Sequence, residues 1–147
     1  MKAVRGLLVL AAAAVVLAVL GVGMGDAPKS PDAAPTGAAL AASKQRVAAG
    51  GAMVQKGKEE FEHEGCDACH AIAATGAKGK LGPRLDTLAG DSVEDDVKNI
   101  IKPRADIVEG YQPNLMPTDY AKRMGADDVR AVAAFLKAAS GGKQGGG

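Results

Sequence analysis

Large aromatic side chains are scarce in this 147-residue chain. Aromatic residues make up 3% of it, with two Phe, two Tyr and no Trp, although hydrophobic residues as a class reach 47%. Much of that apolar content is alanine, whereas a compact domain usually fills its centre with larger side chains that bury more apolar area. The sequence therefore predicts a single domain whose core is either thin or completed by a group that is not an amino acid.

The chain also has little net charge and few cysteines. Lys and Arg total 18 against 17 Asp and Glu, which gives a net charge of +1. The basic residues are scattered and form no basic run beside aromatics, so the sequence does not indicate nucleic-acid binding. The only cysteines are Cys66 and Cys69. Because a pair this close together closes no long loop, the chain is not a disulfide scaffold.

The N-terminal residues 1–25 read MKAVRGLLVLAAAAVVLAVLGVGMG, with Lys2 and Arg5 before an uncharged, mostly apolar run. A cleavable signal peptide has an apolar region of roughly 7–15 residues, and a spanning helix needs about 20. The run lies between these lengths. A small-x-small pattern at Gly23 and Gly25 favours cleavage, while the length of the run and the basic residues before it favour an uncleaved anchor. Both alternatives place the rest of the chain outside the cytoplasmic membrane.

Residues 26–51 are rich in Pro and Ala and predict a linker. A short helix is compatible with residues 38–49, but its apolar residues are mostly alanine and would bury little. The Gly-rich residues 141–147 predict a flexible tail. The folded domain is therefore expected over residues 52–140.

Three segments of this domain have helical patterns, and we expect an all-α fold. MVQKGKEEFEHEG predicts a helix that ends at Gly65. SVEDDVKNIIKP begins with a partial capping box and repeats apolar residues at helical spacing. GADDVRAVAAFLKAAS is the clearest helix, with acidic residues at its start. The loops between them, 71–91 and 104–125, are unusually long for a compact domain. Such loops are tolerable when they wrap around a bound group.

The segment GCDACHAIAATG, residues 65–76, carries both cysteines and places His70 directly after Cys69. C-x-x-C-H is the attachment signature of c-type haem. Two thiols three residues apart on one helical turn point the same way, so they can bond to the two vinyl groups of one porphyrin. His70 then lies under the iron as its proximal ligand. We therefore predict one covalently bound haem c.

Three other interpretations of the pair are open from the residues alone. A thioredoxin-like dithiol would follow a strand in a βαβ unit, and no strand pattern is evident here. A zinc site would take Cys66, Cys69, His70 and His63, but structural zinc sites usually add a second ligand pair further along the chain. A local disulfide, or two buried thiols without further chemistry, is the simplest alternative.

A haem held by His70 raises the question of a second axial ligand. The candidates are Met53, Met116, Met124 and His63, or no residue at all. His63 precedes Cys66 by three residues and would struggle to reach the opposite haem face. Met116 lies in GYQPNLMPTDY, where flanking prolines stiffen the loop and can hold a weak thioether ligand. Because a lone Met is more often a packing residue, we expect Met124 to pack in the core and favour Met116 as the ligand.

Residues 54–139 resemble a class I monohaem cytochrome c domain of bacterial type. GKEEFEHEGCDACH is similar to the first helix and haem site of that family, GPRL to its proline loop, GYQPNLMP to its methionine-ligand loop, and DDVRAVAAFL to its terminal helix. The run IIKPRADIVEGYQPNLMP is similar to cytochrome c domains that work with terminal oxidases, although the copper-binding domain of a fused oxidase subunit is missing.

This resemblance implies an all-α cytochrome c fold of three main helices, with long loops around one haem. It implies thioethers at Cys66 and Cys69, iron ligation by His70 and Met116, and a hydrogen bond from His70 to the Pro83 carbonyl. Tyr111 and Asn114 would lie near the haem edge or ligand loop. Gly57 and Phe61 would meet the last helix near Phe135 and Leu136.

The implied function is single-electron transfer rather than catalysis. Transient partners would be a respiratory electron donor and a terminal oxidase or reductase, on the outer side of the cytoplasmic membrane or in the periplasm. Nucleic acid is not an expected partner, and membrane contact would come only from an uncleaved N-terminal anchor. The alternatives are a haem enzyme or gas sensor with an open sixth site, and a C-x-x-C thiol oxidoreductase.

Overall fold

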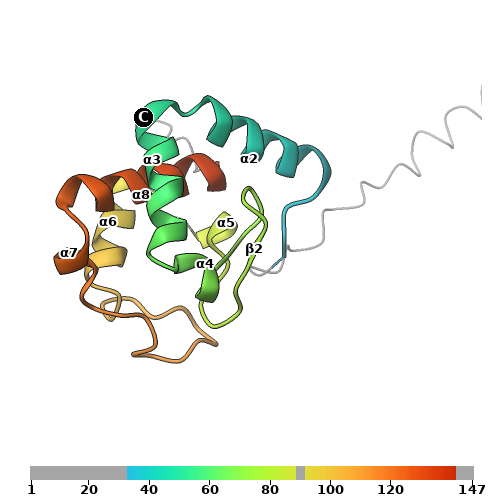
Figure 1. Ribbon diagram of the computed structural model, residues 1–147. Helices are drawn as coiled ribbons and strands as arrows, with labels where there is room; N and C mark the ends of the chain where they lie inside the picture. Colours follow the sequence, from blue (N-terminus) through green and yellow to red (C-terminus); the bar gives the residue numbers. More distant parts are fainter. Residues whose placement is uncertain (1–32, 89–91, 142–147) are drawn as a thin grey trace, which may run out of the picture.

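The computed structural model describes residues 33–88 and 92–141, which are mostly helical (Figure 1). The elements in chain order are α2 (Gly37–Ala49), α3 (Gly51–His63), α4 (Cys66–Cys69), β1 (Ala71–Ile72), β2 (Ala77–Lys78), α5 (Leu85–Leu88), α6 (Val93–Ile101), α7 (Tyr120–Arg123) and α8 (Ala126–Ser140). The three predicted main helices correspond to α3, α6 and α8, so the all-α prediction is confirmed apart from one very small hairpin.

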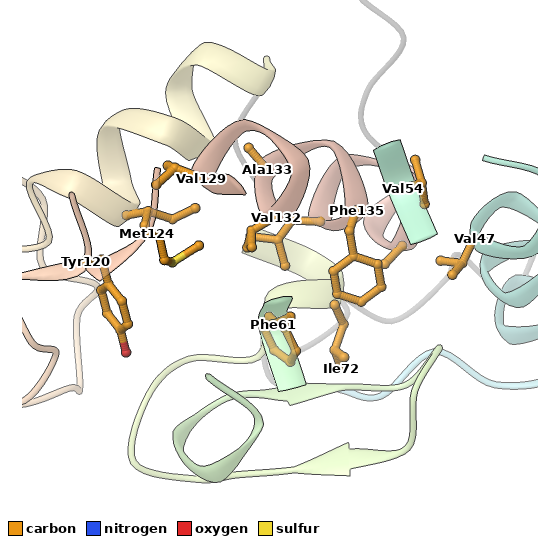
Figure 2. Close-up of a cluster of buried hydrophobic side chains, with 13 residues drawn as sticks. Val47, Val54, Phe61, Ile72, Tyr120, Met124, Val129, Val132, Ala133 and Phe135 are labelled. Atoms are coloured by element: carbon orange, nitrogen blue, oxygen red, sulfur yellow. The ribbon is translucent and has the colours of Figure 1, made fainter. Parts of the chain in front are cut away.

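The core forms where α3 crosses α8 (Figure 1). Phe61 and Phe135 meet there with ring centroids 5.4 Å apart and planes tilted by 57°, a favourable geometry for an aromatic pair. Ile72 completes the fully buried group (Figure 2). Gly57 lies against the backbone of α8, and a Cβ atom at this position would overlap the carbonyl of Ala131. The predicted approach of Gly57 and Phe61 to the last helix is therefore confirmed.

Helix α6 begins with the capping box that the sequence predicted. Ser92 Oγ accepts a hydrogen bond from the backbone N–H of Asp95 at 3.1 Å, and the Ser92 N–H donates to Asp95 Oδ2 at 3.1 Å. Aspartate thus fills the place that glutamate usually takes. The helix packs on α8 through its apolar face, and Ile100 is buried. This fixes the start and the orientation of α6.

The two long loops contain short elements that the sequence did not predict. In the first, β1 and β2 form an antiparallel hairpin, with Ala71 opposite Lys78 and Ile72 opposite Ala77, and α5 follows. In the second, α7 provides one helical turn just before α8. Residues 102–119 remain an irregular loop that closes one side of the molecule (Figure 1).

Helix α2 lies within the predicted linker of residues 26–51. Residues 37–49 form the short helix that the sequence allowed over 38–49, and this helix packs on α8. Ser43 Oγ donates to the Ala139 carbonyl at 2.5 Å, and Arg46 donates to the carbonyls of Ala138 at 2.8 Å and Ala139 at 3.3 Å. Both residues lie in the last turn of α8, where backbone carbonyls find no N–H partner within the helix itself. Polar contacts thus hold a helix whose alanines bury little.

We expect Arg46→Ala to lower the free energy of unfolding by about 1 kcal/mol, because two hydrogen bonds to the negative end of α8 are lost. Denaturant unfolding followed by circular dichroism measures this change. Lys44→Ala, an exposed substitution on the same helix, serves as the control. An unchanged midpoint for Arg46→Ala would mean that α2 docks without this contact.

Two sequence predictions lie outside the described residues: the N-terminal signal or anchor over 1–25, and the tail beyond Gly141. Within residues 33–88 and 92–141, none of the helices combines the length and the hydropathy needed to cross a membrane.

Candidate cofactor pocket

One large pocket opens between α4, α6, α8 and the loop of residues 102–119. Its wall is mainly apolar and includes Phe61, Leu85, Ile100, Val132 and Leu136. The pocket brings together every site residue that the sequence predicted, namely Cys66, Cys69, His70, Pro83, Tyr111, Asn114 and Met116. Residues that are 50 positions apart in the sequence therefore line one cavity.

Cys66 and Cys69 form the ends of the one-turn helix α4, and both are free thiols. Gly65, with φ 71°, turns the chain from α3 into this helix. Burial raises the pKa of the Cys66 thiol to about 11, and the nearby Glu64 and Asp67 carboxylates add to this. The thiol is therefore protonated at neutral pH. A dithiol oxidoreductase needs the opposite, a thiolate with a lowered pKa, so this site does not support that alternative.

His70 has a fixed ring orientation. Its Nδ1 lies 2.8 Å from the carbonyl oxygen of Pro83. Because a carbonyl can only accept, Nδ1 carries the hydrogen and Nε2 keeps the lone pair that a metal ligand needs. Burial lowers the pKa of His70, although the hydrogen bond to Pro83 opposes the shift. The ring is thus neutral at pH 7. The hydrogen bond that the resemblance implied is confirmed.

The chain segment that carries Pro83 is anchored to the histidine region at several points. The Gly82 N–H donates to the Cys69 carbonyl at 2.9 Å, and a Cβ atom at Gly82 would collide with the His70 ring. The buried Asp86 accepts two hydrogen bonds from the Ala73 N–H, at 2.8 and 3.0 Å, and is paired with Arg84. The sequence analysis did not predict a role for Asp86. The only signal for its ion pair was Arg84, two residues earlier in the chain.

The three candidate methionines differ in burial and in their position relative to the pocket. Met116 is half-buried, lines the pocket and packs against the core cluster. Met124 also lines the pocket but is only 5% exposed and belongs to the core cluster. Figure 2 shows it next to Tyr120. The prediction that Met124 packs in the core is therefore confirmed. Met53 is 58% exposed and is not part of the lining. Met116 therefore remains the best candidate for a second ligand.

Tyr111 and Asn114 lie on the loop that leads to Met116. Both line the pocket, Tyr111 half-buried and Asn114 exposed. Asn114 has a left-handed backbone with φ 66°, a conformation that Asn tolerates better than most residues. It therefore turns the chain two residues before Met116.

The structure does not bring together the four residues of the alternative zinc site. The His63 side chain is 79% exposed, and its Nδ1 lies 3.9 Å from Glu60 and 3.7 Å from Glu64. Among the described residues, the groups close enough to share a metal ion are Glu60, His63 and Glu64, without either cysteine. His63 is therefore a solvated residue at the end of α3.

The residues of the pocket suit a haem by their chemistry. Two reduced thiols and a neutral histidine with a free lone pair share one wall, a thioether is available from the loop, and apolar side chains surround them. Gly82 leaves room for the His70 ring where any side chain would displace it. The sequence model of the family described as cytochrome c matches residues 54–140, which is more than half of the chain. The chain belongs to the cytochrome c family. Neither the search of curated proteins nor the search of solved structures gave a match.

Membership of the cytochrome c family gives the pocket its general role. Proteins of this family bind haem and transfer electrons, and as a family they are carriers rather than enzymes. The match ends at the last residue of α8 and begins within α3. Helix α2 therefore lies outside the matched residues.

Proposed function

We propose that this cytochrome c is a single-electron carrier with one covalent haem, held by thioethers at Cys66 and Cys69 and ligated by His70 and Met116. The observation that carries the proposal is the convergence of these four residues on one apolar pocket, with Nε2 of His70 left as the free nitrogen. A bound haem supplies the one-electron change between ferrous and ferric iron.

The chain's own residues define how such a site works. The Pro83 carbonyl fixes the tautomer and the direction of the His70 ring. Met116, on the loop of residues 102–119, would hold the iron together with His70, so that no site for a substrate would be left. The wall around them is mainly apolar, and a thioether ligand in such surroundings would favour the ferrous state. These features suit electron transfer without bond chemistry at the iron.

Partner docking is proposed at the rim of the pocket. Leu81, Ile107 and Leu115 line the pocket and are 62%, 44% and 54% exposed. Large apolar side chains around a cofactor opening suit weak, transient contacts of the kind that redox proteins make. We propose a respiratory electron donor and a terminal oxidase or reductase as partners. We also propose that the protein lies outside the cytoplasmic membrane, either anchored or released, because of the basic and apolar sequence of residues 1–25.

An optical spectrum of protein made in a host with haem-attachment machinery tests this function. We expect a c-type spectrum, a weak far-red sulfur-to-iron band in the ferric state, and no carbon monoxide binding in the ferrous state. Attached haem that binds carbon monoxide and lacks the far-red band would indicate an enzyme or sensor with an open sixth site. A colourless protein would contradict the proposal altogether.

The Met116→Ala variant identifies the sixth ligand. We expect it to keep covalent haem, lose the far-red band and bind carbon monoxide, because the axial thioether is removed. Met124→Leu is the matched control, since it conserves volume in a buried methionine of the same pocket. If the band survives in Met116→Ala and disappears in Met124→Leu, the assignment of the ligand is reversed.

A further inference from the structure

Residues 82–86 run alongside residues 69–73, the segment that carries His70. Three hydrogen-bonded pairs join the two segments, and the partners in each pair are 13 positions apart: Cys69 with Gly82, His70 with Pro83, and Ala73 with Asp86. A constant offset means that the segments run parallel and in one register. The contact of His70 with its carbonyl partner is therefore the middle one of three.

Pro83 depends on its neighbours for its position. Proline has no backbone N–H, so this residue has no donor of its own to fix it. On one side, the N–H of the preceding residue, Gly82, donates to the Cys69 carbonyl at 2.9 Å. On the other side, the Ala73 N–H donates to the carboxylate of Asp86, at 2.8 Å to Oδ1 and 3.0 Å to Oδ2. The Pro83 carbonyl thus lies between two anchors.

Asp86 is the stronger of these two anchors. Its side chain is only 2% exposed, and charged residues are almost never buried to this degree unless they are paired. The partner is Arg84, whose Nη1 lies 2.6 Å from Oδ2. Hydrogen bonds that involve a charged group are roughly twice as strong as those between neutral groups. The carboxylate therefore binds the Ala73 N–H more firmly than a backbone carbonyl would.

Asp86 also connects the histidine segment to a fixed part of the fold. It belongs to the one-turn helix α5, which packs on α8 and on β1. The preceding residue, Leu85, lines the pocket and packs against the core cluster. Ala73 directly follows β1 and begins the turn of the small hairpin. The contact between Asp86 and Ala73 therefore ties this hairpin, and His70 just before it, to the core.

We propose that Asp86 is a positioning residue for the iron ligand of this cytochrome c. Its carboxylate keeps the two segments in register, which holds the Pro83 carbonyl on the Nδ1–H of His70. The strength of that hydrogen bond then contributes to the reduction potential of the haem iron at Nε2. This inference rests on the proposed function, because a reduction potential requires a haem in the pocket.

The sign of the effect follows from the chemistry of the imidazole ring. A hydrogen bond from Nδ1–H to a carbonyl raises the basicity of Nε2, the nitrogen that is free to bind a metal. A more basic ligand donates more electron density and stabilises the more positive ferric iron, and hydrogen bonding around the ligands is one means by which a protein sets the potential. Loss of the Asp86 anchor weakens the hydrogen bond of His70 and should raise the potential.

The test compares the haem-loaded wild type with Asp86→Ala and Asp86→Asn. A redox titration gives the potential, and NMR of ferrous protein labelled with ¹⁵N-histidine gives the exchange rate of the His70 Nδ1–H. In Asp86→Ala we expect a higher potential and an exchange on the order of tenfold faster, because a charge-assisted anchor is lost. Asp86→Asn removes the same charge but keeps an oxygen that accepts from the Ala73 N–H. It should retain slow exchange and show a smaller rise in potential.

The outcomes separate this inference from the proposed function. A wild type without haem overturns both. A c-type spectrum with the wild-type potential in Asp86→Ala overturns the inference alone, and so do equal rises in both variants with unchanged His70 exchange, which would show an effect of charge only. If Asp86→Ala does not fold, hydrogen exchange in the wild type decides. The Ala73 amide and the His70 Nδ1–H should be protected alike, and an unprotected Ala73 amide beside a protected His70 overturns the inference.

Discussion

Replacing both Cys66 and Cys69 with alanine is expected to abolish covalent haem attachment. The two thiols share one wall of the pocket with His70, and nothing else in the sequence can form a thioether to a vinyl group because the chain has two cysteines in all. The haem stain on a denaturing gel should fall below detection. The mass of the wild type should exceed that of its polypeptide by one haem, and the mass of the double variant should not.

Asp67→Asn is the matched control for this double variant, because it changes the residue next to Cys66 without touching a thiol. It should stain like the wild type. Single Cys66→Ala and Cys69→Ala variants retain one thioether and should stain more weakly. A haem stain that survives in the double variant would show that the cofactor is not held through these residues.

Gly57→Ala is expected to lower the free energy of unfolding by about 2–4 kcal/mol, since overpacking at a rigid contact is costly. The added methyl group would meet the carbonyl of Ala131 and lie 2.9 Å from the backbone N of Val132. These are backbone atoms of α8, which cannot rotate away, so α3 and α8 would have to separate.

The sign of this change makes the measurement decisive. Helix propensity alone predicts that alanine stabilises the middle of α3 by about 1 kcal/mol relative to glycine. Denaturant unfolding therefore distinguishes the two effects by direction. Ala52→Ser, which adds one atom at an exposed position of the same helix, should change stability little. A stabilised Gly57→Ala variant would mean that α3 and α8 do not cross at this point.

The sequence predicted those features that depend on local patterns. Ser92 and Asp95 marked the start of α6, the C-x-x-C-H motif predicted one wall of the pocket, and the flanking prolines marked the loop that brings Met116 to the pocket. Each signal lies within a few neighbouring residues, and short-range chemistry decides its meaning. The helix crossing at Gly57 was also predicted, but only through the resemblance to a known family.

The features that were missed depend on contacts between distant parts of the chain. Ser43 and Arg46 bind α8 carbonyls more than 90 residues away, and an alanine-rich helix gives no periodic signal for this. Asp86 and Asp96 are buried carboxylates, whereas aspartate in a sequence suggests surface. Only the folded chain shows which charged residue faces inward.

The docking of α2 has a practical consequence for electrochemistry. The residues that line the pocket begin at Phe61, so none of them comes from α2, and α2 packs instead against α3 and the last turn of α8. A surface linkage introduced before Gly37 would therefore attach this cytochrome through its α2 side. Immobilised in this way on an electrode or resin, the protein would present its apolar rim to soluble partners.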